Sequence, residues 1–344
     1  MSRYDTLNLA LIPPPASVAE LDFDTTYAAM QADFVVAAAS YNVGYNVTTL
    51  RSDPAGWALR AASYRIMYKR AEINDAINAV LVPTATLGDL DNVCADFNIV
   101  RRVLVPADPT TSPPSLAIME SDDALRARRI LAPEALSSAG PGGAYRFFAI
   151  AASADVRDAA IYGPEDGLVG DTFVQPGQVL ICILSASGAG GLVPEATLQE
   201  VAQFLCVWDC PDIPAYLRPS RAQLDNNAIR PDTDHIILRA VQVQNFMVTG
   251  VLSVAPGASA AVVQAQATAA IQAYCTAQNV VGGKVTMNSL IAAGRLLAPD
   301  GTSPALDFAL TTPVADIVPG PLGTPHLTAI TILVNVVDGS VGHG

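Results

Sequence analysis

The alternation of strand and helix patterns after residue 155 constrains the fold more than any other feature of this sequence. Short apolar runs such as QVLICILS (178–185) are typical of buried strands, and helical patterns follow at 194–209 and 259–275. Further strand patterns cover 155–164, 235–244, 246–254, 306–312 and 327–337, and another helical pattern covers 286–297. Because each sheet must bury one face against helices, the economical architecture is two layered modules in series.

The first hundred residues are predicted to be helical. A helix over 17–39 would open with Ser17 as its N-cap, after an extended proline segment at 13–15. A second helix is predicted over 57–82, where apolar residues recur every seven positions. The members of this seam are Leu59, Ala62, Ile66, Ile73, Ala76 and Val80, and Lys69 interrupts it. Such a stripe either packs inside its own domain or binds partner helices, and the sequence leaves both alternatives open.

The stretch between the helical region and the two modules predicts how the chain is divided. The proline-rich segment 105–115 is expected to be a semi-rigid linker. Helix resumes within 120–137, where three arginines at 126, 128 and 129 suit a solvated face, with an anion clamp as the alternative. We therefore predict an α+β protein with a helical N-terminal region followed by two α/β-layered modules. The predicted parts are an arm and helical bundle region (1–104), the linker (105–115), a middle helical plus α+β module (116–240) and a C-terminal α+β module (241–344).

The glycine-rich loop SSAGPGGAYRFFAI (137–150) raises the question of phosphate binding, because small residues before a helix are what an anion requires. The spacing argues against a dinucleotide, since Tyr145 stands where a third glycine would be needed. No Gly-Lys-Ser/Thr triplet follows, which argues against a Walker loop. We expect Gly140, Pro141, Gly142 and Gly143 to form a structural turn between two helices.

Residues for catalysis or metal binding are not clustered locally. The three histidines lie far apart in sequence, and the five cysteines fit reduced thiols. Cys206 and Cys210 lie four apart without a second pair, so zinc is not indicated. The segment PDTDH (231–235) reads better as a polar turn before a strand than as a metal site. We therefore predict no catalytic, cofactor-binding or metal-binding residues, with a dispersed active site around PDTDH as the alternative.

Charge and hydropathy exclude two classes of partner. The chain has 19 basic and 32 acidic residues, a net charge of −13, which repels nucleic acid and anionic membranes. No apolar run approaches the roughly 20 residues that a membrane span needs, and the start MSRYDTLN does not resemble a signal peptide. With 51% hydrophobic and 15% charged residues the chain is long and apolar enough to form folded cores, and we expect it to be made in the cytoplasm.

Several segments, in chain order, carry a family resemblance. The most specific block is 122–150, and the matching positions in it are Arg126, Arg128, Pro133, Glu134, Ser137, Ala139, Gly140, Pro141, Gly143, Ala144 and Tyr145. A second block at 229–240 matches through Arg230, Pro231 and Asp234, and upstream matches occur at 13–30 and 77–101. Together these segments resemble the baseplate J-like family of contractile-tailed phages and related tailocins. One departure is 210–220, which is longer than the usual connection in the family.

The resemblance implies a structural baseplate wedge protein. Such a protein would pair with a second copy of itself and with a tail protein I relative, forming a ring around the central hub beside sheath-proximal wedge proteins. It would be part of the virion tail after assembly in the host cytoplasm, without nucleic-acid or membrane partners. The helix at 57–82 would then be a partner helix, and the linker at 105–115 would let two copies adopt different orientations. The same scaffold in a bacterial contractile injection system stays as an alternative.

Overall fold

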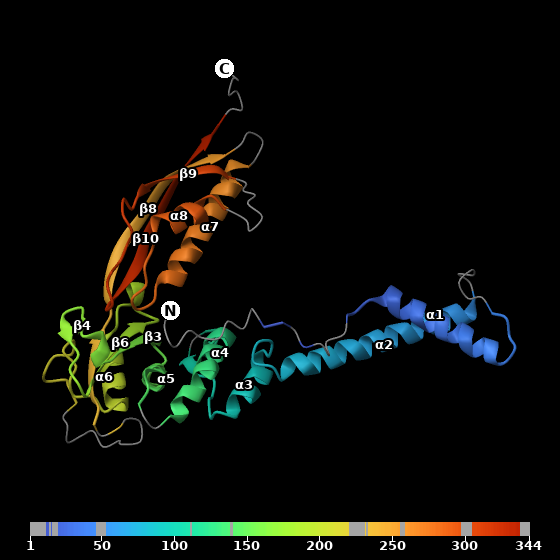
Figure 1. Ribbon diagram of the computed structural model, residues 1–344, viewed down its shortest axis with the longest axis horizontal. Coiled ribbons are helices and arrows are strands. Elements are labelled where there is room, and N and C mark those ends of the chain that lie inside the picture. The colour runs from blue at the N-terminus through green and yellow to red at the C-terminus, as the bar shows by residue number, and fades with distance from the viewer. Residues whose placement is uncertain are drawn as a thin grey trace. The chain divides into compact units, whose positions relative to one another are not determined.

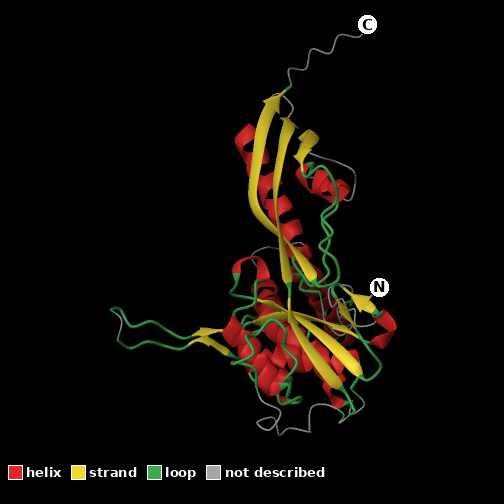
Figure 2. Cartoon of the chain, turned by 90° about the vertical axis from the view of Figure 1, so that its left-hand side faces the viewer, coloured by secondary structure: helices red, strands yellow, loops and turns green. Residues whose placement is uncertain are grey.

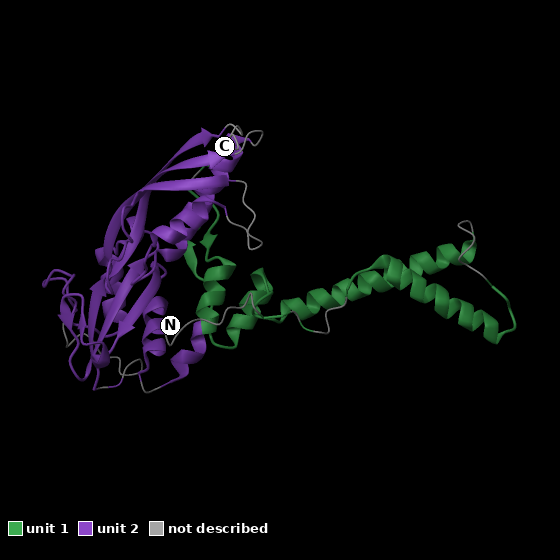
Figure 3. Cartoon of the chain, turned by 45° about the horizontal axis from the view of Figure 1, so that its top comes forward, with its two compact units in different colours: residues 1–130 green, residues 131–344 purple. Residues whose placement is uncertain are grey.

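The computed structural model describes residues 12–13, 15, 20–45, 53–110, 112–137, 140–219, 231, 233–254, 259–296 and 305–337. The chain divides into two compact units, residues 1–130 and 131–344 (Figure 3). The first unit is mainly helical, and the second consists of sheets with packed helices (Figure 1). This arrangement confirms the predicted α+β class. The finer predicted boundaries near 104, 115 and 240 stay a prediction.

The helices of the first unit are α1 (Phe23–Ser40), α2 (Pro54–Ala79), α3 (Leu87–Ala95) and α4 (Asp122–Leu131). Helix α1 begins later than predicted because Asp22 is its N-cap, whose carboxylate accepts hydrogen bonds from the backbone N–H groups of Asp24 and Thr25 at 3.1 Å. Ser17, the predicted cap, lies outside the described residues. Helix α2, in contrast, begins earlier than predicted, because Asp53 caps it and Pro54 occupies its first position.

Helices α1 and α2 pack antiparallel through small and polar side chains. The Ser63 hydroxyl donates to the Met30 sulfur at 3.1 Å, and the Arg70 guanidinium donates to the Thr26 hydroxyl at 3.2 Å. The buried residues of α2 are Gly56, Ser63 and Asn74, none of which is a large apolar residue. The residues of α2 that are buried are therefore small or polar, and the Phe23 ring of α1 also stacks on the Tyr64 ring of α2, with 4.4 Å between the ring centroids.

The proline-rich stretch expected to be a linker forms a hairpin instead. Strand β1 (Val103–Val105) pairs antiparallel with β2 (Ile118–Met119), and an isolated bridge between Asp108 and Ser115 extends the pairing. The apolar runs on either side of the prolines pair with each other, so the chain returns to its starting point rather than spanning a gap. We call residues 103–119 the β1–β2 arm.

The first sheet of the second unit has the order β3-β6-β7. Its strands are β3 (Val156–Tyr162), β6 (Gln178–Ser185) and β7 (His235–Ala240); β3 runs antiparallel and β7 parallel to β6. Helices α5 (Gly142–Ala152) and α6 (Glu195–Phe204) pack on it, and β4 (Leu168–Val169) pairs with β5 (Thr172–Phe173) beside it. Residues 180–184 of β6 are all 0% exposed, which explains the uninterrupted apolar run of this central strand. Helix α6 ends at Phe204, short of the predicted 209, and Trp208 lies beyond it.

The second sheet has the order β10-β8-β9 and lies next along the chain (Figure 2). Its strands are β8 (Gln242–Val254), β9 (Ala305–Thr312) and β10 (Gly323–Val336), and it packs against α7 (Ala260–Gln278) and α8 (Met287–Gly294). Helix α7 buries residues four apart: Val263, Ala267, Ile271 and Cys275. From the sequence alone, the helical period predicts a stripe of Val263, Ala267, Ala270 and Tyr274. The prediction is right for the first two and one residue off for the others, because Ala270 and Tyr274 are only half-buried.

Two sets of close contacts stabilise the second unit, one inside the second sheet module and one between the two sheet modules. The Phe308 ring fills the space beside Gly250 and Gly294, where an added Cβ would lie 2.6 Å and 2.4 Å from ring carbons. The Asn279 side-chain amide donates to the Thr324 hydroxyl and to the carbonyls of Gly190 and Pro325 at 2.9–3.0 Å. Because Gly190 lies just after β6 of the first sheet and Thr324 belongs to β10 of the second, these bonds hold the two modules of this unit together.

Candidate functional site

The predicted seam lies partly on the open surface of α2. Ile66, Ile73 and Val80 are 38%, 56% and 69% exposed, Ala76 is also exposed, and Leu59 and Ala62 are half-buried. Lys69 pairs with Glu72 at 2.5 Å on the surface, where such a pair contributes little to stability. A helix of 26 residues therefore carries an apolar stripe that α1 does not bury. Its use as an interface stays a prediction.

A second apolar surface of α2 was not expected from the sequence. A shallow groove of about 630 Å³ is lined by Leu21, Ala61, Tyr64, Arg65, Met67, Tyr68 and Ala71. The side chains of Tyr64 and Tyr68 are 58% and 60% exposed, and Trp57, seven residues before Tyr64, is 63% exposed. The spacing of these three aromatic residues places them on one side of the helix, which is the signal that sequence reasoning missed. Leu21 precedes α1, so its place in the groove is a tertiary contact that spacing cannot reveal.

A buried ion pair holds the base of the β1–β2 arm. Arg128 on α4 donates from Nε and Nη2 to the two carboxylate oxygens of Glu120, at 2.8 Å and 2.5 Å. The two side chains are only 10% and 6% exposed. The Glu120 carboxylate also accepts a hydrogen bond from the backbone N–H of Arg102 at 3.2 Å, and Arg128 also donates to the carbonyl of Val100 at 2.8 Å. The pair thus fixes the chain on both sides of the hairpin.

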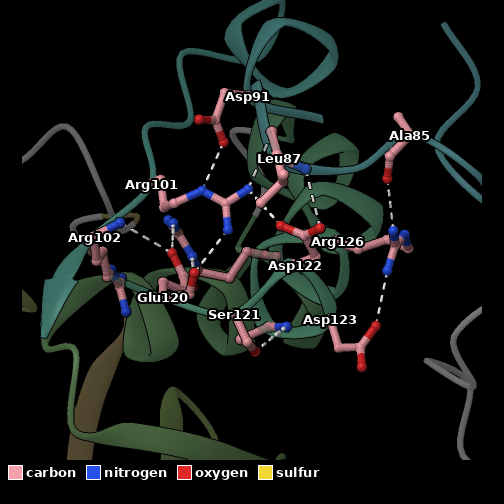
Figure 4. Close-up of polar contacts among 12 residues, drawn as sticks. Ala85, Leu87, Asp91, Arg101, Arg102, Glu120, Ser121, Asp122, Asp123 and Arg126 are labelled. Carbon is pink, nitrogen blue, oxygen red and sulfur yellow. Dashed lines mark hydrogen bonds and ion pairs between the residues drawn. The ribbon is translucent and has the colours of Figure 1, made fainter. Parts of the chain in front are cut away.

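Arg101, whose side chain is 11% exposed, extends this network to two further carboxylates (Figure 4). Its guanidinium donates to Asp91 at 2.8 Å, to Asp122 at 2.7 Å and to the backbone carbonyl of Glu120 at 2.7 Å. The Leu87 backbone N–H and Arg101 lower the pKa of the Asp122 carboxyl, so it stays ionised. The base of the arm is therefore joined to α3 and α4 by charge-assisted hydrogen bonds, which are stronger than neutral ones.

The three arginines of α4 do not form the solvated face or the anion clamp considered from the sequence. Arg128 is buried against Glu120, Arg126 donates to the carbonyls of Val82 and Ala85 at 2.8 Å, and Arg129 lies over the Phe97 ring at 3.8 Å. All three hold neighbouring segments of the chain, because the helix packs on α3 and on the segment before it. Their guanidinium groups are thus used in the fold.

The glycine-rich loop joins the two blocks that carry the family resemblance. Gly140 has φ +66°, and an added Cβ would lie 3.0 Å from both Pro231 and Asp234. The Tyr145 hydroxyl, one turn into α5, donates to the Asp234 carboxylate at 2.6 Å. The loop lies between a short 3-10 helix at Ala132–Leu136 and α5, with Pro141 as the N-cap of α5 and Gly142 and Gly143 as its first residues. Gly140 and Gly143 are therefore sites of close packing, and the role of this loop as a structural turn stays a prediction.

The PDTDH segment does not assemble a site from its described residues. Asp234 binds Tyr145, whereas His235 Nε2 lies 2.9 Å from Asp209 and its ring stacks edge-on against Trp208. Asp232 lies outside the described residues. Within the described ranges, no three histidine, cysteine, aspartate or glutamate side chains are grouped to hold a metal ion.

The cysteines are buried thiols in the described structure. All five are free, and burial raises the pKa of Cys182 and of Cys210 to about 12. Cys206 and Cys210 do not point to a common ligand, since each sulfur lies 3.9 Å from a different backbone carbonyl, of Gln203 and Val207. In these surroundings the thiols are inert at neutral pH.

Asp155 organises the loop after β6. Its carboxylate accepts hydrogen bonds from the hydroxyls of Ser185 and Thr197, both at 2.7 Å, and from the backbone N–H of Ser187 at 2.8 Å. Burial alone would raise the pKa of Asp155, but these hydrogen bonds outweigh it and lower the pKa. The carboxylate is fully used inside the fold and is not available as a catalytic base.

Two comparisons with known proteins agree with the family resemblance found in the sequence. The model of the baseplate J-like N-terminal domain matches residues 51–108. The chain is also 29% identical over 314 residues to Baseplate protein J of Escherichia phage P2, an alignment that covers 91% of this chain and 92% of that protein. The resemblance to the baseplate J-like family is thereby confirmed.

The baseplate J-like match contains the surfaces described above. Residues 51–108 include α2 with its open stripe and most of its aromatic groove, helix α3, and the first strand of the arm. The part of the chain that the family model matches is therefore rich in exposed apolar side chains.

Among the described helices, none is long and apolar enough to cross a bilayer.

Proposed function

We propose that this chain is a structural protein of a contractile-tail baseplate and not an enzyme. The similarity to a phage baseplate protein over nine tenths of the chain supports this role. Several described polar groups give further support, because the three arginines of α4, Asp155, Asp234 and His235 make contacts within the fold. A protein of this kind acts through the surfaces it offers to its neighbours.

Within the baseplate, the proposed role is that of a wedge subunit. The chain pairs with a second copy of itself and with a tail protein I relative, next to hub and sheath-proximal wedge proteins, and closes a ring around the central hub. It belongs to the virion tail and is assembled in the host cytoplasm. These partners follow from the family resemblance, and the open surfaces of the first unit are where we expect them to bind.

The observation that carries the proposal is the open stripe of α2. Ile66 and Ile73 remain 38% and 56% exposed although the helix already packs against α1. A helix that is apolar on more than one face is usually covered by further helices. The seven-residue spacing of the stripe favours a left-handed bundle with partner helices.

Aspartate at both positions tests this function. The double variant Ile66→Asp with Ile73→Asp removes side chains that are already partly exposed, so the isolated chain loses only part of the roughly 1.5–3 kcal/mol that full burial of each would supply. We expect unchanged helicity by circular dichroism and loss of copurification with the tail protein I relative. The matched control is Ala32→Asp with Ala39→Asp, exposed on α1 and also seven apart, which should leave copurification intact.

Two results would contradict the proposal. Aggregation or loss of helicity in the isolated double variant would show that the stripe packs within its own chain. Electron microscopy of the purified particle, with the chain labelled, supplies the second test. Absence of the label from the baseplate would refute the structural role itself.

A further inference from the structure

The two edge strands of the second sheet differ in how they are protected against further pairing. The order β10-β8-β9 leaves the outer sides of β10 and β9 without a neighbouring strand. Proteins protect such edges with charged side chains, prolines or bulges, because the unpaired backbone groups of an edge strand bind other strands. Strand β9 has all three: the exposed Asp307, register shifts near both ends of its pairing with β8, and prolines at 304 and 313.

Strand β10 lacks this protection over its second half. Residues 329–336 contain no charged residue and no proline, and the register shift of this strand lies at their start, between Leu327 and Ala329. The strand has 14 residues, which is long for an edge strand. Leu333 and Val336 are 65% and 50% exposed. A long, uncharged edge with exposed apolar side chains is a site for the addition of a further strand.

The free side of β10 has backbone groups that only an extended chain can pair. In a strand with one neighbour, every second residue directs its N–H and C=O away from the sheet. Within the described part of the chain, one side chain binds the backbone of 329–336: Gln264 of α7 donates from Nε2 to the carbonyl of Ile332 at 2.8 Å. A helix cannot pair with the other outward groups, because its own backbone groups are bonded internally. The edge therefore selects a strand.

The position of α7 excludes a second β10 as that strand. Helix α7 packs chiefly on β10 rather than on β8, so it lies over the edge of the sheet. Two β10 strands joined antiparallel by two-fold symmetry would lie about 4.8 Å apart, with both α7 helices on the same face. Packed helices need about 8–10 Å between their axes, so these two would overlap. A single strand that has no helix on this face meets no such obstacle.

The surroundings of the edge determine which side chains the added strand can have. Ile332 belongs to the core between the sheet and α7, and Ile330 and Val334 pack against that core. Helix α7 contains no Asp, Glu, Lys or Arg. A charged side chain on the α7 side of the added strand would therefore lose water without gaining a partner. We expect the strand to be uncharged and to be apolar on the side that faces α7.

We propose that β10 receives, along residues 329–336, an extended strand from a neighbouring protein of the baseplate. The strand has about six or more residues without charge or proline, and it adds a fourth strand to the three of this sheet. Backbone hydrogen bonds supply the affinity of such a contact, and alternate side chains supply its specificity. The contact is additional to those proposed for the first unit. It rests on the proposed function, because a baseplate neighbour supplies the strand.

Hydrogen exchange compares the edge in the isolated full chain and in the purified particle. We expect alternate backbone N–H groups of 329–336 to exchange about tenfold or more slowly in the particle, because the added strand accepts hydrogen bonds from them. The matched control is the other edge, residues 306–311 of β9, which should exchange equally in both. Equal exchange of β10 in chain and particle, or slowing of the same size at both edges, would overturn the proposal.

A photoreactive residue identifies the strand. Leu333 is replaced by p-benzoylphenylalanine, with Ala309 on β9 as the control position, since both are exposed. In the irradiated particle we expect position 333 to crosslink, in higher yield than position 309, to an uncharged, proline-free segment of a neighbouring protein. A yield no higher than that of the control contradicts the proposal. A crosslink to a charged segment, to β10 of a second copy, or within the isolated chain contradicts it equally.

Lysines at the edge test the contact during assembly. Thr331→Lys with Leu333→Lys places two charges on β10, and Ala309→Lys with Thr311→Lys is the matched control on β9. Because all four residues are exposed, both isolated variants should unfold at the temperature of the unaltered chain. In competition with the unaltered chain, we expect the β10 variant to enter the particle about tenfold or more less often than the control. Equal incorporation of the two variants would overturn the proposal.

Failure of this proposal can be told apart from failure of the proposed function. A baseplate that contains the chain, but in which β10 exchanges as it does in the isolated chain, leaves the structural role intact and removes only the added strand. A particle whose baseplate lacks the chain removes the structural role, and the added strand with it.

Discussion

Replacing Glu120 by alanine tests whether buried charge holds the base of the arm. The change leaves Arg128 with a side chain that is 10% exposed and without its carboxylate partner. Removing one member of a buried ion pair typically costs about 3–5 kcal/mol, because the remaining charge is uncompensated. A whole domain is stable by only about 5–15 kcal/mol, so the change removes a large share of the stability of the first unit. We expect this loss to appear first where Glu120 makes its contacts.

Hydrogen exchange measured by mass spectrometry resolves the effect by segment. The backbone N–H of Arg102 loses its acceptor, and the pairing between position 120 and the Arg102 carbonyl opens more often. At about 1.36 kcal/mol for each tenfold change, a loss of 3 kcal/mol accelerates exchange roughly 150-fold in peptides covering 99–131. Peptides from the second unit should exchange as before.

Two further variants decide the cause. Glu120→Gln combined with Arg128→Met removes both charges, and we expect it to recover most of the protection, since replacing a buried pair by neutral groups is often close to neutral. Asp123→Ala breaks the pair with Arg126, in which the aspartate side chain is 98% exposed, and should change little. An acceleration below about fivefold in Glu120→Ala would mean a cost under about 1 kcal/mol. That result would refute a role for buried charge at the base of the arm.

Two other substitutions test the second unit. Asp155→Asn should lower the midpoint of urea unfolding at pH 7. The difference in midpoint between the variant and the unaltered chain should disappear as the pH falls below about 4, because a carboxyl whose pKa is lowered in the folded state stabilises the fold only while it is ionised. A difference in midpoint that is independent of pH would contradict this. Gly250→Ala places a methyl group 2.6 Å from a buried ring and should destabilise by about 1–3 kcal/mol, whereas Gly88→Ala, which meets nothing within 4 Å, should be neutral or slightly stabilising. Equal effects of the two alanines in thermal unfolding would show that the core beside Gly250 adjusts freely.

The sequence predicted best the elements whose burial repeats along the chain. The run at 178–185 is a central strand, and the positions Val263 and Ala267 are buried on α7, because a local period reports which side of an element faces the core. The hairpin at 103–119 was missed since the four prolines suggested a spacer, while its pairing depends on residues sixteen positions apart, Val103 and Met119. The ion pair of Glu120 and Arg128 was missed for a related reason: Glu120 precedes the helix that carries Arg128, and no helical spacing connects them.

The two units differ in how much of their apolar surface is buried within the unit itself, and this difference bears on the function. In the second unit, each sheet packs against helices of its own module, and strands such as β6 are fully buried. In the first, α1 covers the face of α2 that buries Gly56, Ser63 and Asn74, and every described residue of the hairpin at 103–119 except Asp108 is exposed. Exposed apolar surface of this extent in a protein that is otherwise acidic is stabilised when a partner binds, because a ligand that binds only the folded state raises the stability of that state. We therefore expect the first unit to become more stable when a partner binds it, and the second unit to have the same stability with and without that partner.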